Sequence, residues 1–120
     1  MTHADFTAWA DLPDEAAVAM ADWEMCPLVV DGIERGGAAV RGTEIHVAIA
    51  PKWRCATMAR QRVRDFLAPL IGRAGFLTTR AVPNLAHHRF LSRLGFARTW
   101  QQPGVDHYML CELPFTARGN

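Results

Sequence analysis

Two residues in the run "EIHVAIA", at positions 44–50, have the chemistry of a general base. Glu44 and His46 are two positions apart, so a β-strand would place their side chains on the same face. Histidine titrates near neutrality and burial can raise the pKa of a glutamate, so either type can accept a proton near neutral pH. The alternative is structural: His46 bonds to strand neighbours, and Glu44 is a charge at the strand edge. The spacing alone leaves both interpretations open.

The same run leads into "PKWRCATMAR", which reads as a short connection followed by the start of a helix. The first N–H groups of a helix have no intrahelical partner and lie at the positive end of the helix dipole, so they attract anions. Arg54 would add a cation beside them, as a phosphate-binding loop requires. A solvated arginine before an ordinary helix is the competing interpretation.

Three other features could suggest chemistry. His87 and His88 are not expected to share a metal, because consecutive helix residues point about 100° apart and no third ligand is nearby. Cys55 would lie near a helix start beside Arg54, which could lower the pKa of its thiol, although a small apolar filler is the simpler role. The arginines of 54–73 lack interleaved aromatic residues, so the stretch does not predict nucleic-acid binding.

Bulk composition narrows the class of protein. The 120 residues predict a single domain spanning 1–120, and 13 Lys and Arg against 12 Asp and Glu give a net charge of +1. That balance does not favour nucleic acid or an anionic membrane as partner. Three cysteines without a CxxC pair predict no zinc site, and no stretch resembles a signal peptide or a membrane span of about 18 apolar residues. We therefore expect a cytoplasmic protein.

The elements that would position these residues alternate between helices and strands. A helix is predicted for 14–23, followed by an antiparallel meander of two or three strands that ends with the strand 44–50. The turn or bulge signals of this meander are Asp31-Gly32, Gly36-Gly37 and Arg41-Gly42-Thr43.

The second half is predicted in the same way. An amphipathic helix begins near 57, and Pro69 should kink it or end it near Ala68. A strand follows at 76–82, then a helix capped by Asn84 and ended by Gly95. Strands at 97–101 and 106–113 join through Pro103-Gly104, and 116–120 form a loose tail. This order predicts a mixed α/β layer fold.

Two blocks, "IAPKWRCATMA" and "NLAHHRFLSRLGF", resemble the GNAT superfamily of acyl-CoA-dependent N-acyltransferases. In that family a central strand leads into Arg/Gln-x-x-Gly-x-Gly/Ala and a helix that takes the CoA pyrophosphate; Arg54 matches the first position and Ala59 the last. The second hallmark is an Asn past the next strand and a helix ending in Gly-Phe, matched by Asn84 and Gly95-Phe96. The likeness covers about 44–113. In its general character the sequence is most similar to small, divergent members of the family, such as phage-encoded ones.

The chain departs from the family pattern at two positions. Thr57 stands where the loop has its first glycine, which lets the backbone approach a phosphate closely. Leu91 stands where many members carry a tyrosine that protonates the leaving thiolate, four residues before the Gly of Gly-Phe. Tyr108, the only tyrosine in the chain, could supply that proton only if its strand borders the site.

The resemblance implies a GNAT-like α/β fold, with a mixed, mostly antiparallel sheet of five to seven strands, about three helices and a shortened N-terminal part. It implies acetyl transfer from acetyl-CoA to a primary amine on a small molecule or peptide, with Glu44 or His46 as base and Tyr108 as candidate acid. The implied contacts to acetyl-CoA are Val47, Ala48 and Ile49 for pantetheine, Arg54, Cys55, Ala56, Thr57, Met58 and Ala59 for pyrophosphate, and Asn84 in the cleft. A homodimer through the terminal strands is compatible with the family, and no metal is expected. The alternative, favoured by Thr57 and Leu91, is a catalytically inactive binding or assembly module.

Overall fold

The computed structural model describes residues 1–53 and 59–111. Within it the chain divides into two compact units, Met1–Ala59 and Arg60–Asn120. Each unit contains three strands and is described by itself.

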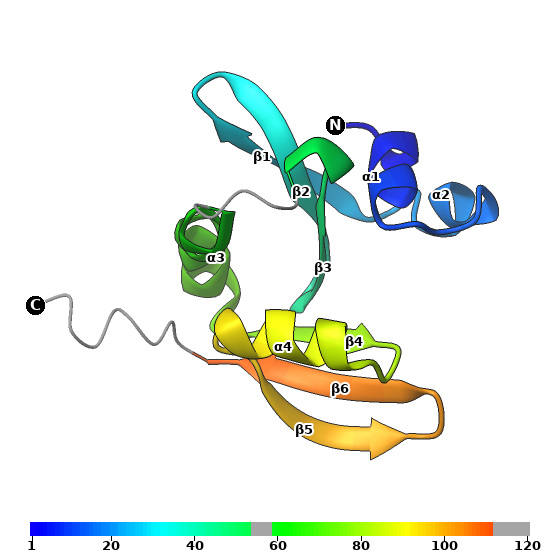
Figure 1. The fold of residues 1–120 in the computed structure, drawn as a ribbon, viewed down its shortest axis with the longest axis vertical. Coiled ribbons are helices and arrows are strands. Elements are labelled where there is room, and N and C mark those ends of the chain that lie inside the picture. The colour runs from blue at the N-terminus through cyan, green and yellow to red at the C-terminus, as the bar shows by residue number, and fades with distance from the viewer. Residues whose placement is uncertain (54–58, 112–120) are drawn as a thin grey trace, which may run out of the picture. The chain divides into compact units, whose positions relative to one another are not determined.

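The first unit is an antiparallel meander with two short helices before it (Figure 1). Its central strand, β2, pairs with β1 on one side and with β3 on the other. The elements are α1 (His3–Trp9), α2 (Glu15–Ala19), β1 (Glu24–Val30), β2 (Ile33–Arg41), β3 (Glu44–Ile49) and the 3-10 turn η1 (Pro51–Trp53).

The predicted turns of this meander are confirmed at both hairpins. Asp31 and Gly32 have φ of 54° and 77° between β1 and β2, and Gly42 has φ of 62° between β2 and β3. Gly36 instead lies inside β2, beside a register shift of the β1–β2 ladder. A Cβ at Gly36 would overlap the carbonyl oxygen of Ala48 and lie 2.9 Å from Cα of Ile49. The glycine therefore permits close packing of β2 against β3.

The N-terminal helices differ from the prediction. The helix expected at 14–23 is only the five-residue α2, and α1 was not predicted. Its start is a capping box: Thr2 Oγ1 accepts from the backbone N–H of Asp5, and the Asp5 carboxylate accepts from the N–H of Thr2. These hydrogen bonds lower the pKa of Asp5.

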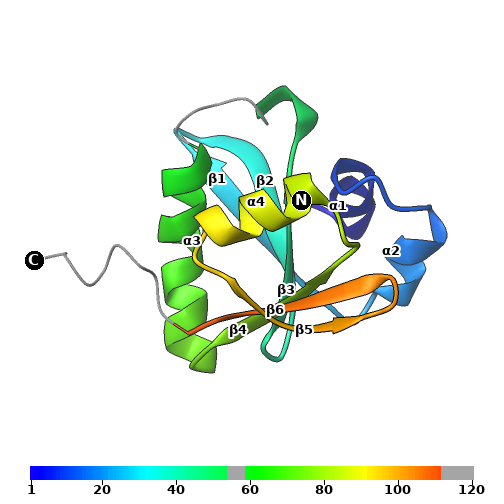
Figure 2. The same ribbon diagram turned by 60° about the horizontal axis from the view of Figure 1, so that its bottom comes forward.

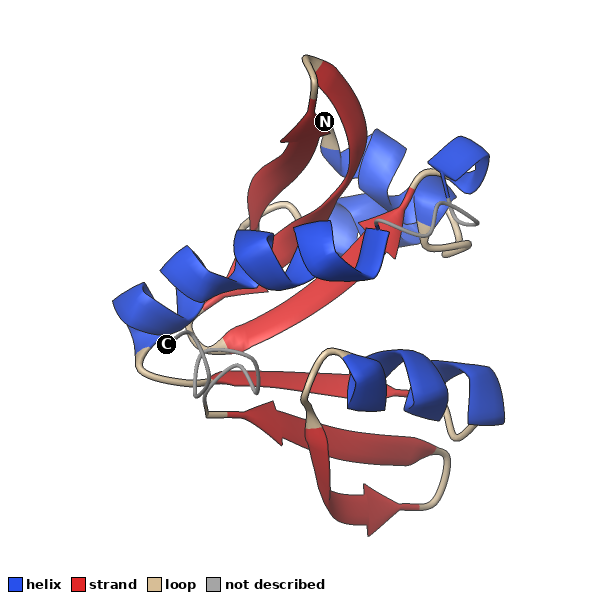
Figure 3. Cartoon of the chain, turned by 60° about the vertical axis from the view of Figure 1, so that its left-hand side comes forward, coloured by secondary structure: helices blue, strands red, loops and turns tan. Residues whose placement is uncertain are grey.

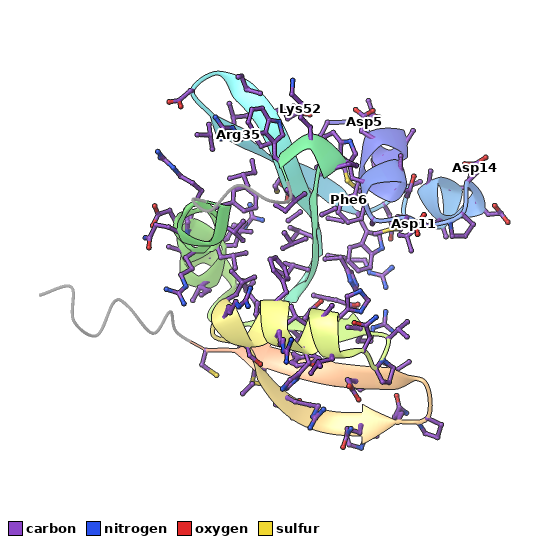
Figure 4. All side chains as sticks on the ribbon, viewed as in Figure 1. Asp5, Phe6, Asp11, Asp14, Arg35 and Lys52 are labelled. Atoms are coloured by element: carbon purple, nitrogen blue, oxygen red, sulfur yellow. The ribbon has the colours of Figure 1, made fainter. Side chains whose placement is uncertain are left out.

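The core of the first unit forms around Phe6, which is fully buried. It packs in one cluster with Trp23, Ala39 of β2 and Ala48 of β3. Figure 4 shows Phe6 on α1, whereas Asp14 points outward from α2. The cluster fixes α1 against the face of the meander that carries Ala48, which is also the face of Glu44 and His46 because strand side chains alternate.

The second unit has a three-stranded antiparallel sheet in the order β4, β6, β5. The β5–β6 hairpin turns at Pro103-Gly104, where Gly104 has φ of 82°, and is seen clearly in Figure 2. In Figure 3, α4 runs along these strands. The elements are α3 (Ala59–Ala74), β4 (Leu77–Ala81), α4 (Leu85–Arg93), β5 (Ala97–Gln102) and β6 (Val105–Leu110).

Of the two outcomes predicted for Pro69, a kink or a helix end near Ala68, the structure excludes the second. The helix continues through Pro69 to Ala74 and stops before Gly75, whose φ is 91°. Val63, Leu67 and Leu70 are buried at the spacing of one helical face. Burial of this face stabilises the helix enough to tolerate the backbone hydrogen bond that proline removes.

The predictions for α4 and for the order of elements from β1 onward are confirmed. Asn84 caps α4 by accepting from the N–H of His87 at 3.0 Å, and Gly95, with φ of 100°, ends it. The six strands of the described residues lie within the predicted five to seven, with four α-helices instead of about three. β6 ends at Leu110 rather than at 113, and the tail predicted at 116–120 lies outside the described residues. No helix of the part described has the length and apolar character to span a membrane.

Candidate active site

Glu44 and His46 lie side by side on β3, as their spacing predicted. His46 Nε2 is 2.8 Å from Glu44 Oε2. The side chains are 29% and 21% exposed for His46 and Glu44, so the pair is sheltered yet reachable from solvent. A carboxylate only accepts hydrogen bonds, so it fixes the imidazole proton on Nε2 and leaves Nδ1 as the ring atom that can accept a proton.

Trp23 packs against this histidine. The ring centroids of Trp23 and His46 are 5.4 Å apart, with planes tilted by 50°. The indole is itself fixed in place: Trp23 is 7% exposed, the guanidinium of Arg41 lies 4.8 Å from its ring centroid, and its carbonyl oxygen is 3.0 Å from His3 Nε2. The imidazole is therefore oriented by a carboxylate and by a buried aromatic ring.

The cofactor-binding residues predicted on β3 do not all face the same way. Ala48 is buried in the cluster around Phe6, whereas Val47 and Ile49 are half-buried. Because side chains alternate along a strand, Val47 and Ile49 lie on the face opposite Glu44 and His46. A ligand beside the pair could therefore meet 47–49 only through their backbone.

Two cations gather at the end of β3. The Arg35 guanidinium carbon lies 4.1 Å from the ring centroid of Trp53, and the Lys52 ammonium lies 5.5 Å from it. A guanidinium nitrogen of Arg35 also lies 3.8 Å from a carboxylate oxygen of Asp31. Figure 4 labels Arg35 on β2 and Lys52 on η1. Both cations thus lie against the ring of Trp53, the last residue described before the segment predicted to bind pyrophosphate.

That segment itself is not described. Arg54, Cys55, Ala56, Thr57 and Met58 lie outside the described residues, and Ala59 is the first residue of α3. Their roles stay predictions. The part of the chain that is described contains no group of three or more His, Cys, Asp and Glu residues placed to hold a metal ion.

Tyr108, the candidate acid, lies on β6 and is 2% exposed. Its hydroxyl is 3.0 Å from His88 Nδ1 of α4. Burial raises the pKa of Tyr108, the charge of Asp106 raises it further, and Arg98 opposes both. The phenol therefore keeps its proton and cannot reach a ligand except through His88 or a local movement.

His87 and His88, which were not expected to share a metal, have different surroundings. His87 is exposed, with Nδ1 3.2 Å from the carbonyl oxygen of Val82, whereas His88 is half-buried against Tyr108. The two rings point apart, as expected for consecutive helix residues.

A buried carboxylate lies beside the tyrosine. Asp106 is 3% exposed, accepts a hydrogen bond from Gln101 Nε2 at 3.3 Å and lies 3.7 Å from Arg98. These contacts join β5 to β6 beside Tyr108. The sequence offered no signal for this network, because the residues come together only through the register of the hairpin.

Comparisons with known proteins identify the fold. No protein-family model matches the sequence, and no curated protein matches it significantly. Among solved structures, aminoglycoside acetyltransferase AAC(6')-Ib in complex with coenzyme A and kanamycin aligns with a TM-score of 0.67 at 14% identity, covering 100% of this chain and 96% of that one.

Two further structures agree. A GNAT-family acetyltransferase of Bacillus anthracis aligns with a TM-score of 0.60 at 16% identity, over 92% of this chain and 84% of its own. The ribosomal-protein-S18-alanine N-acetyltransferase of Escherichia coli aligns with a TM-score of 0.54 at 17% identity, over 78% and 74%. The chain has the GNAT fold, as its two sequence blocks predicted.

Proposed function

We propose that this protein is an N-acetyltransferase that moves the acetyl group of acetyl-CoA to a primary amine. The observation that carries the proposal is the hydrogen-bonded pair of Glu44 and His46, half-buried on β3. The GNAT fold supports it, because the solved relatives named above are acetyltransferases and one of them binds coenzyme A. Fold alone does not fix activity, so the pair is the stronger support.

In the proposed reaction His46 is the base and Glu44 orients it. Nδ1 of His46 removes a proton from the acceptor ammonium, directly or through a water, and Glu44 stabilises the imidazolium that forms. The free amine attacks the thioester carbonyl. A C–N bond forms, the C–S bond breaks, and the thiolate leaves with the electron pair of that bond. The former amine nitrogen then gives up its extra proton, to the thiolate or to water, which leaves a neutral amide. Aminolysis of a thioester needs little beyond this proton transfer and good positioning.

Acetyl-CoA would supply the activated acyl group and its diphosphate handle. The backbone of Val47, Ala48 and Ile49 would pair with the pantetheine arm, and Asn84, which caps α4, is the proposed residue of the cofactor cleft. Arg54 and the loop 54–59 are the proposed pyrophosphate site. Lys52 adds positive charge near that loop, which favours the anionic handle.

The acceptor class is tested with an amine panel: an aminoglycoside, a diamine and a peptide with a free N-terminal alanine. Each amine is incubated with acetyl-CoA and the protein, and the masses of the products are measured by mass spectrometry. The proposal expects at least one product heavier by one acetyl group. His107→Gln serves as a control for His46→Gln. It also replaces a histidine, but His107 hydrogen-bonds to Gln102 on the β5–β6 hairpin and belongs to no proposed catalytic group.

The inactive binding module remains the alternative, and Leu91 is the observation that favours it. If the chain is such a module, no amine should give an acetylated product. A chain that binds acetyl-CoA but transfers nothing would support the module, whereas an acetylated product would exclude it.

A further inference from the structure

Arg41 lies at the same end of the meander as the pair of Glu44 and His46. In the β2–β3 ladder Arg41 is directly opposite Glu44, and Ala39 is directly opposite His46. Residues that pair directly across an antiparallel ladder project from the same face of the sheet, so the side chain of Arg41 shares the face of the pair. All of these residues belong to the first unit, so their arrangement is independent of the second.

One indole supports both the guanidinium and the imidazole. The guanidinium carbon of Arg41 lies 4.8 Å from the ring centroid of Trp23, and the ring centroid of His46 lies 5.4 Å from it. Trp23 is buried in the cluster around Phe6, so its ring is a fixed support. A planar guanidinium stacked on such a ring loses conformational freedom before a ligand arrives. The cation and the proposed base are therefore both oriented in advance.

The contact between Arg41 and Asp22 is weak. Nη1 of Arg41 lies 3.5 Å from a carboxylate oxygen of Asp22, which is longer than the usual contact between a guanidinium and a carboxylate. The two side chains are 54% and 68% exposed, so water screens their attraction. The carboxylate of a ligand could therefore replace Asp22 and form two short hydrogen bonds to the guanidinium.

The charges on this face suit a ligand that carries both signs. Glu44 attracts an ammonium group to His46, whereas Arg41 attracts a carboxylate and repels a second ammonium group. Opposite residues of an antiparallel ladder have Cα atoms about 5 Å apart, and residues two positions apart on one strand are about 7 Å apart. These spacings match a molecule in which only a few bonds separate the amine from the carboxylate.

We propose that Arg41 is a specificity-determining residue that binds the carboxylate of the acceptor, and that the acceptor is a small amino acid. The proposal rests on the proposed acetyltransferase function and names the acceptor class of that site. The amine of the amino acid lies against Nδ1 of His46 while its carboxylate lies against Arg41. No bond forms or breaks at Arg41; its contact places the amine for proton removal and attack.

The carboxylate is tested with pairs of acceptors that differ only in that group. Glycine, β-alanine and 4-aminobutyrate are each compared with the corresponding amide in steady-state acetylation by acetyl-CoA. Three chain lengths are used because the span between His46 and Arg41 selects among them. At least one acid should exceed its amide in kcat/KM by about 10-fold to 100-fold, chiefly through a lower KM, as expected for a hydrogen-bonded charge pair.

The outcomes of this comparison separate the two proposals. Amides that react as well as all three acids, or a diamine or aminoglycoside that reacts better than every acid, would overturn the amino-acid proposal and leave the proposed function intact. A chain that acetylates no amine at all would overturn the proposed function, and this proposal with it.

Substitutions then test Arg41 itself. Arg41→Gln should raise KM for the preferred acid about 10-fold and abolish its advantage over the amide. Arg41→Lys should restore part of that advantage, because it keeps the charge without the planar fork. Arg73→Gln, which removes an exposed arginine from the last turn of α3, should keep the full advantage. An advantage that survives Arg41→Gln would overturn the proposal.

A second variant guards against a purely structural effect, because loss of Arg41 could also loosen Trp23. Asp22→Asn leaves Arg41 on the indole and removes only the competing carboxylate. It should therefore lower KM for the preferred acid, in the opposite direction to Arg41→Gln, and leave KM for the amide nearly unchanged. An Asp22→Asn variant with a raised or unaltered KM for the acid would overturn the proposal.

Discussion

His46 Nε2 lies 2.8 Å from Glu44 Oε2, with the ring of Trp23 packed against the same imidazole. The sequence named Glu44 and His46 as separate candidates for one task. Their contact joins them into one hydrogen-bonded pair, and in the proposed reaction the carboxylate fixes the tautomer and Nδ1 of His46 accepts the proton.

This unit predicts non-additive kinetics. Glu44→Gln and His46→Gln should each lower kcat/KM for acetyl transfer by about 100-fold to 10,000-fold, the usual contribution of a general base. The double variant should be little worse than His46→Gln, because residues that act together lose their function together. The measurement is steady-state kinetics of thiol release. Losses that multiply in the double variant would show that the two residues act independently.

The phenol of Tyr108 should titrate at a higher pH than that of an exposed tyrosine. Burial, reinforced by Asp106, raises its pKa from the ordinary 10.0. As the only tyrosine, it can be followed by ultraviolet absorbance of the native chain. The midpoint should lie above that of the unfolded chain in denaturant, and a lower native midpoint would contradict the buried site.

The same shift predicts how stability changes at alkaline pH. The folded pKa of Tyr108 lies above the unfolded value, so the unfolded chain releases this proton first as pH rises. The stabilising contribution of the phenol is complete below about pH 10 and is lost as pH rises through the folded pKa. The free energy of unfolding, measured with urea, should therefore fall less above pH 10 for Tyr108→Phe than for the unaltered chain. Parallel alkaline losses in the two proteins would contradict the assignment.

Phe6 should be essential to the first unit. Phe6→Ala should lower the free energy of unfolding by about 3–5 kcal/mol, because it removes a fully buried ring from the cluster with Trp23 and Ala48. Val18→Ala, at a side chain 79% exposed, should change it by less than about 0.5 kcal/mol. Urea unfolding followed by circular dichroism measures both, and equal effects would show that α1 does not pack as described.

Two glycines offer opposite outcomes for the same substitution. Gly36→Ala should destabilise the chain by about 1–3 kcal/mol, since its Cβ meets the backbone of Ala48 and Ile49. Gly72→Ala has no heavy atom within 4 Å of the added Cβ and lies inside α3, so it should stabilise by about 0.5–1 kcal/mol. Thermal unfolding distinguishes them, and a stable Gly36→Ala would contradict the close approach of β2 and β3.

Local signals in the sequence predicted much of the fold. Turn residues with positive φ, such as Gly32 and Gly42, located the hairpins, and Asn84 with Gly95 bounded α4. Thr2 and Asp5 have the spacing of a capping box and could have predicted the start of α1, which was not predicted. Pro69 does not end α3, because burial of the apolar face of this helix outweighs one absent backbone hydrogen bond.

The candidate site was predictable only where partners are close in sequence. Glu44 and His46 share a strand face by period alone. Trp23 meets His46, Arg35 meets Trp53 and His88 meets Tyr108 through register and packing that no local pattern encodes. The likeness to the GNAT family predicted the fold correctly.

Thermal unfolding with and without acetyl-CoA tests the central claim most directly. A ligand that binds the native state stabilises it, by about 2.7 kcal/mol at 100 times its Kd. Acetyl-CoA at millimolar concentration should raise the midpoint of unfolding, and Arg54→Ala should remove most of that rise. No change in midpoint for the unaltered chain would contradict the account.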